Sequence, residues 1–79
     1  MTFAVIFEKG PTSYGAYVPD VPGCVAAAKS LDEVRGLIRE AILFHIEELR
    51  DSGYPVPQST SLCEYVEVEV PASIEQQPR

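Results

Sequence analysis

Positive charge is scarce in this sequence, and the scarcity excludes a first class of functions. Six lysines and arginines stand against twelve aspartates and glutamates in 79 residues, which gives a formal net charge of −6 at pH 7. A protein that grips nucleic acid by itself neutralises the phosphates with clustered basic side chains. We therefore expect no direct DNA binding from this chain alone, and its charge suits a basic protein partner instead.

Long apolar runs are also missing. No stretch approaches the roughly 20 consecutive apolar residues that a membrane span requires. The opening residues carry no basic side chain and reach an acidic one at Glu8, unlike a secretion signal. The length allows one small domain at most. We expect a cytoplasmic protein without membrane contact, with one domain in residues 1–71 and a flexible tail in residues 72–79.

Cysteine is limited to Cys24 and Cys63, which are 39 positions apart, with no C-x-x-C spacing and no adjacent histidine. The alternatives are a disulfide, a metal pair, or two small buried side chains in a reducing compartment, and the spacing favours the last. The five glycines are isolated and form neither a P-loop nor a G-x-G-x-x-G motif. The sequence therefore predicts no nucleotide and no other cofactor.

Alternating apolar side chains predict strands at residues 2–8, 14–18, 24–28 and 64–70. The first has apolar residues on both faces, which is typical of a central strand, and the last is expected to turn its three valines toward the core. Between the third and fourth strands, residues 30–52 show helical periodicity. The order β-β-β-α-β predicts a small α+β fold, with one helix packed on one face of a small sheet.

The ends of the predicted helix are well marked. Ser30 and Glu33 have the spacing of a capping box, in which each side chain satisfies a free backbone donor near the first turn. At the other end, Gly53 allows a left-handed stop and Pro55 prevents the helix from continuing. Gly36 lies inside the helix, where glycine costs about 1 kcal/mol relative to alanine.

Carboxylates are numerous, but their pattern predicts no active site. Asp20, Glu8 and Glu40 are candidates for a two-metal hydrolase, whose acids must converge on ions about 4 Å apart. They fall in a loop, at a strand end and off the apolar stripe of the helix, and so suit solvated acids better. His45 lies on that stripe without an adjacent nucleophile and acid, so we expect a core residue. We predict no catalytic and no metal-ligating residue.

Two motifs at a defined separation carry a family resemblance. Residues 17–24 read YVPDVPGC, and residues 53–59 read GYPVPQS. Between them, the predicted helix begins with SLDEV at residues 30–34. With these motifs, the sequence resembles the HicB antitoxin family over about residues 3–70.

The resemblance implies a partial RNase H-like fold that lacks the catalytic acids of a true RNase H, and thus a protein that is no enzyme. It implies an antitoxin that binds and neutralises a small basic HicA-type toxin, which is an mRNA-cleaving ribonuclease. Longer family members append a DNA-binding domain, and from these 79 residues alone we expect no direct binding to operator DNA. From exposure and charge, we expect the toxin-binding surface to include Asp20, Val21, Pro22, Gly23, Glu40, Phe44, Glu47 and Glu48.

A single helix leaves one face of the sheet uncovered. In so small a domain this predicts a homodimer or a higher homo-oligomer. The alternative function is an orphan HicB-like module without a toxin partner, which binds another protein or a small ligand.

Overall fold

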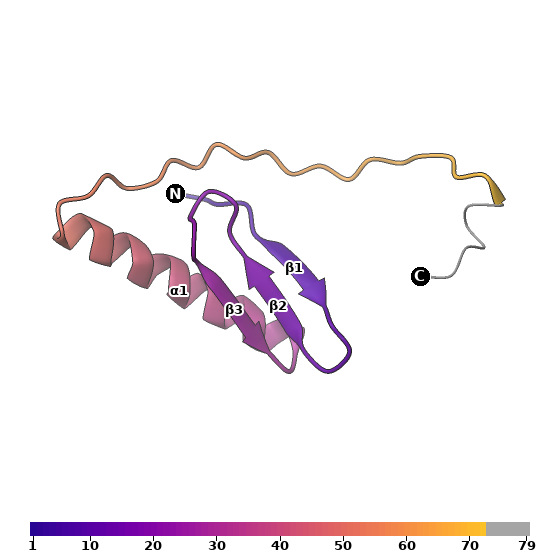
Figure 1. Ribbon diagram of the computed structural model, residues 1–79, viewed down its shortest axis with the longest axis horizontal. Coiled ribbons are helices and arrows are strands. Elements are labelled where there is room, and N and C mark those ends of the chain that lie inside the picture. Colours follow the sequence, from indigo (N-terminus) through magenta and orange to yellow (C-terminus); the bar gives the residue numbers. More distant parts are fainter. Residues whose placement is uncertain (73–79) are drawn as a thin grey trace.

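The computed structural model describes residues 1–72. Three strands, β1 (Ile6–Lys9), β2 (Tyr14–Tyr17) and β3 (Val25–Ala28), form an antiparallel sheet in the order β1-β2-β3. Helix α1 (Leu31–Asp51) lies across one face of this sheet (Figure 1). The predicted α+β class and the β-β-β-α order are confirmed. The predicted tail, apart from its first residue, lies outside the described range.

The register of the sheet decides which side chains meet the helix. Phe7 pairs with Ala16, and Ala16 pairs with Ala26, so the three side chains form one row across the sheet. Ala16 is buried in the core, which places this row on the helix face. The neighbouring row points away from the helix and consists of Ile6, Tyr17 and Val25.

The loop between β2 and β3 is made of two consecutive turns. The backbone N–H of Val21 donates to the carbonyl of Val18, and the N–H of Cys24 donates to the carbonyl of Val21. In the second turn, Pro22 and Gly23 occupy the central positions, and Gly23 has φ of 82°, as a type II turn requires. The turns bury the Val21 side chain and leave Pro22 and Gly23 exposed.

The predicted caps of α1 are confirmed. Ser30 is the N-cap, with extended backbone angles, and its hydroxyl accepts the N–H of Glu33 at 3.1 Å. The same hydroxyl donates to the Glu33 carboxylate at 3.0 Å. At the C-terminal end, the N–H of Gly53 donates to the carbonyl of Arg50 and the N–H of Tyr54 to that of Leu49. This pair of bonds, with φ of 79° at Gly53, is a Schellman motif.

The core lies between α1 and two of the three strands. The helix packs against β3 and β2, while β1 extends beyond it. Val34 and Ile38 are the fully buried residues of the helix, and they lie one turn apart on its inner face. The whole buried cluster consists of Ala16, Val18, Val21, Cys24, Val34 and Ile38.

Two of the predicted strands differ from the structure. Residues 64–70 run extended but pair with no strand among residues 1–72, and Val66, Val68 and Val70 are 76, 67 and 40% exposed. The chain leaves α1, passes one end of the sheet and continues beyond it instead of along its edge (Figure 1). Because no fourth strand pairs with β1 among residues 1–72, β1 lies at the edge of the sheet. Its apolar residues on both faces had predicted a central strand.

The two cysteines also differ from each other. Both are free thiols, and Cys24 is buried as expected, so burial raises the pKa of its thiol. Cys63 is exposed, because it lies on the segment that continues past the sheet. Of the helices in residues 1–72, none combines the length and the apolar character that crossing a membrane requires.

The two glycines of the helix region allow a matched stability test. A Cβ added at Gly36 would meet nothing within 4 Å, so Gly36→Ala should raise the free energy of unfolding by about 1 kcal/mol. Gly53→Ala is the control, since its positive φ should make alanine unfavourable by about 1 kcal/mol. Urea unfolding at one fixed chain concentration measures both. An unchanged or lower stability of Gly36→Ala would contradict the open space around Gly36 in the helix.

Candidate functional site

Asp20 joins two parts of the chain that are 40 residues apart. Its Oδ2 accepts the backbone N–H groups of Thr60 and Ser61, both at 2.9 Å. Its Oδ1 accepts their hydroxyls, at 3.2 Å from Thr60 and 2.8 Å from Ser61. One carboxylate therefore holds the chain after α1 by four hydrogen bonds. We call this arrangement the Asp20 anchor.

The hydrogen bonds of the anchor favour the charged form of the carboxyl group. The pKa of Asp20 is lowered, first by the backbone hydrogen bond from Ser61 and then by the hydroxyl of the same residue. The bonds from Thr60 act in the same direction, and partial burial opposes them. From the sequence, Asp20 was expected to be a solvated acid in a loop. Instead, the turn presents its carboxylate to a distant segment.

The anchor affects the predicted toxin-binding loop. The carboxylate of Asp20 is engaged within the chain, and the side chain of Val21 is buried. Pro22 and Gly23 remain exposed at the tip of the second turn. The loop thus divides into two residues that fix it in place and two that face outward.

The predicted helix residues share one side of α1. Glu40, Phe44, Glu47 and Glu48 are all exposed, and their spacings of three and four place them along one side of the helix. Leu37 continues this side by one turn, and Phe44 is 65% exposed. We call these five residues the acidic flank. It combines negative charge with two large apolar side chains in water.

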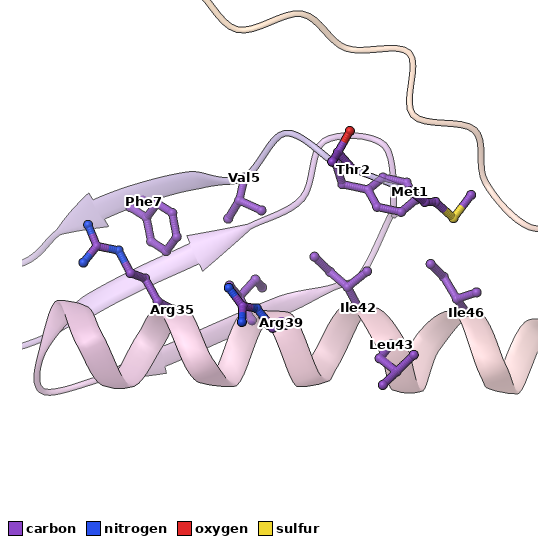
Figure 2. A pocket seen from close by; sticks show the side chains of 11 residues that line it. Met1, Thr2, Val5, Phe7, Arg35, Arg39, Ile42, Leu43 and Ile46 are labelled. Atoms are coloured by element: carbon purple, nitrogen blue, oxygen red, sulfur yellow. The ribbon is translucent and has the colours of Figure 1, made fainter.

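A groove lies along the other side of the helix, between α1 and the segment that contains β1. It has a volume of about 730 Å³. In Figure 2, Ile42 and Ile46 point from the helix toward the N-terminal segment, and Val5 and Phe7 point toward the helix. The charged residues that line the groove are Arg35 and Arg39; the full lining is Met1, Thr2, Phe3, Val5, Phe7, Arg35, Ile38, Arg39, Ile42, Leu43 and Ile46.

The two sides of α1 therefore differ in charge. The acidic flank carries three glutamates, whereas the groove carries two arginines. Arg35 pairs on the surface with Asp32 at 3.3 Å, and such exposed pairs contribute little stability. Sequence reasoning missed the groove, because it depends on how far β1 extends beyond the helix. The arginines at positions 35 and 39, one turn apart, were the available signal.

Residues 1–72 bring together no cluster of metal-binding side chains, that is, no group of three His, Cys, Asp or Glu that could hold a metal ion. His45 is half-buried and lines a shallow depression with Glu48, Leu49, Ser52 and Tyr54. The predicted site residues come from a loop and from one side of the helix, and the anchor adds an extended segment.

Sequence reasoning also missed Thr60 and Ser61. The available signal was a run of three hydroxyl residues, 59–61, directly after the proline-held connection. Such a run supplies both backbone and side-chain donors to one acceptor. Only the fold shows that Asp20 is that acceptor.

Comparison with known proteins gives a family match over nearly the whole chain. Residues 3–72 match a family model described as HicB-like antitoxin of bacterial toxin-antitoxin system. A 14.9 kDa protein from the rep-hol intergenic region of Haemophilus phage HP1 is 36% identical over 66 residues, covering 84% of this chain and 50% of the relative. A UPF0150 protein of Archaeoglobus fulgidus is 44% identical over 48 residues, covering 60% of this chain and 70% of the relative. The chain thus matches about half of the phage protein's length.

The lowered pKa of Asp20 predicts acid sensitivity of the anchor. The stabilisation it supplies is fully present above the carboxyl's unfolded pKa of about 3.9 and is lost as the pH falls through the lower folded-state pKa. NMR titration should show the amide protons of Thr60 and Ser61 shifting in that range.

Asp20→Asn is the matched variant. Its amide group offers one acceptor oxygen in place of two, so the anchor weakens already at neutral pH. The amides of Thr60 and Ser61 should then lose their response below about pH 4. An identical response in the variant and the parent protein would show that Asp20 is not the titrating group.

Proposed function

The chain belongs to the HicB-like antitoxin family, and we propose that it acts by binding and neutralising a small basic HicA-type toxin. Membership indicates a role in a toxin–antitoxin system. The proposed toxin is an mRNA-cleaving ribonuclease, and the antitoxin blocks it by covering its active site. The proposal assigns no catalytic residue to this chain and places the complex in the cytoplasm.

The acidic flank is the observation that supports this proposal most directly. A ribonuclease must present positive charge to its RNA substrate, and a surface of opposite charge attracts and orients such a protein. Three glutamates lie on the flank: Glu40, Glu47 and Glu48. Between them, Phe44 is 65% exposed and supplies the large apolar side chain that protein interfaces place at their centre.

The loop between β2 and β3 forms the second part of the proposed surface. Pro22 and Gly23 are exposed and offer a stiff turn for contact. Asp20 and Val21 act indirectly in this proposal, because the anchor and the buried valine hold the loop in one conformation. A preformed loop loses less conformational entropy on binding.

The proposal covers only the part of the family that this chain represents. The chain spans about half the length of the phage protein that it matches. Activities that further domains would add, including operator binding, therefore form no part of it.

Co-expression with a small basic toxin gene, sought beside the gene of this chain, tests the function. We expect growth rescue from that neighbour's toxicity and a stable complex that co-purifies. A toxic neighbour that is neither rescued nor bound would contradict the proposal and favour an orphan module that binds another protein or a small ligand.

A double charge reversal tests the acidic flank. Glu40→Lys with Glu47→Lys should raise the dissociation constant for the toxin about tenfold or more at low salt, because each change replaces an attraction by a repulsion. The effect should shrink at about 1 M salt, where the screening length falls to about 3 Å. Calorimetric titration measures both conditions.

The matched control reverses two exposed acids elsewhere. Glu8→Lys with Glu67→Lys changes the net charge equally but leaves helix α1, and with it the acidic flank, unchanged. It should weaken binding much less. Equal weakening in both double variants would reduce the effect to net charge and remove the flank from the proposal.

A further inference from the structure

The segment after the Asp20 anchor has the pattern of a β-strand but no strand partner among residues 1–72. Residues 64–70 alternate glutamate or tyrosine with valine, which is typical of a strand with one buried face. In the structure all of these residues are exposed. An extended apolar segment of this kind is a template for pairing with another edge.

The unpaired edge of β1 is a suitable partner for such a segment. β1 pairs with β2 on one side only, although its residues are apolar on both faces, as in a central strand. The sequence predicts a strand from residue 2, yet pairing begins at Ile6, because β2 ends opposite it at Tyr17. A strand added outside β1 would pair residues 3–9, a stretch as long as residues 64–70.

The groove beneath β1 supplies the apolar surface that the valines lack. Phe3 is one of its lining residues. In Figure 2, Val5 and Phe7 point toward the helix, and Ile42 and Ile46 line the helix side. A strand beside β1 places alternate side chains on the helix face of the sheet, over this groove. Val66, Val68 and Val70 have the spacing to fill it.

Charge agrees with this pairing. The charged residues of the groove are Arg35 and Arg39, which are two of only six cationic residues in the chain. The segment carries Glu64, Glu67 and Glu69 and no cationic residue. Glu64 shares the face of the three valines and can approach the arginines, whereas Glu67 and Glu69 lie on the opposite face. The net negative charge of the segment favours the basic groove over the acidic flank.

The path of the chain leaves its own groove uncovered, since no residue of the segment lines it. The Asp20 anchor holds Thr60 and Ser61 at the end of the sheet, and the chain then continues past the sheet without turning along its own β1 (Figure 1). The Cα radius of gyration is 16.2 Å, against roughly 12 Å for a compact chain of this length. The accessible surface is 6691 Å², against roughly 4,700 Å² for a compact protein of this mass.

We propose that two copies exchange residues 62–70, so that the segment of each copy pairs with β1 of the other and covers its groove. Each sheet then gains a fourth strand, and β1 becomes central. The exchange is reciprocal, because each copy offers both a groove and a segment. The acidic flank lies on the opposite side of α1 and stays free in the dimer.

Val68→Asp tests the exchange in the full chain. Val68 is 67% exposed in the single copy, so its replacement leaves the fold of each copy intact. Light scattering at tens of micromolar should give twice the 8.7 kDa chain mass for the parent protein and the single mass for the variant. The dissociation constant of the dimer should rise at least about 100-fold, because both copies lose a buried valine.

Tyr65→Asp is the matched control, since it adds the same charge to the other face of the same segment. It should remain dimeric. A monomeric parent protein, a dimeric Val68→Asp, or equal dissociation in the two variants would overturn the proposal.

Mixing two defective variants distinguishes exchange from a segment that folds back on its own chain. Val68→Asp damages the segment, and Ile46→Asp damages the groove at a half-buried residue outside the buried cluster. Each variant alone should be monomeric, with helix content unchanged by circular dichroism. Their equimolar mixture should contain a dimer with one intact pair of groove and segment. A mixture that stays monomeric would overturn the exchange.

Discussion

The structure depends on one carboxylate that holds two distant parts of the chain together. Asp20 accepts four hydrogen bonds from Thr60 and Ser61, and this fixes where the chain lies after the helix. Residues 62–70 therefore leave from a fixed point at the end of the sheet. The loop geometry and the proposed pairing between copies both follow from this constraint.

The single helix separates two kinds of surface. Its inner stripe, centred on Val34 and Ile38, is used by the sheet. On one side the groove is apolar and carries Arg35 and Arg39, and on the other the acidic flank carries glutamates around Phe44. In our account the basic groove takes the acidic segment of a second copy, and the acidic flank takes a basic toxin. Opposite charges keep the two partners from competing.

Local signals in the sequence were sufficient for the three strands, the helix and both helix caps. These features depend on neighbours in the chain, such as Ser30 with Glu33, and so can be read from spacing. The position of residues 64–70 could not be read in this way, because a strand pattern indicates a buried face without saying which chain buries it. The anchor was hidden for a similar reason: Asp20 and Ser61 are 41 positions apart, and only the fold brings them together.

The concentration dependence of amide hydrogen exchange tests the central claim most directly, namely that residues 64–70 form a strand on another copy. Exchange protection reports whether the backbone N–H groups of this segment are hydrogen-bonded. Our account predicts that protection of these amides rises with chain concentration, in step with the dimer fraction. Protection that is absent at every concentration, or that is present and independent of concentration, would contradict it.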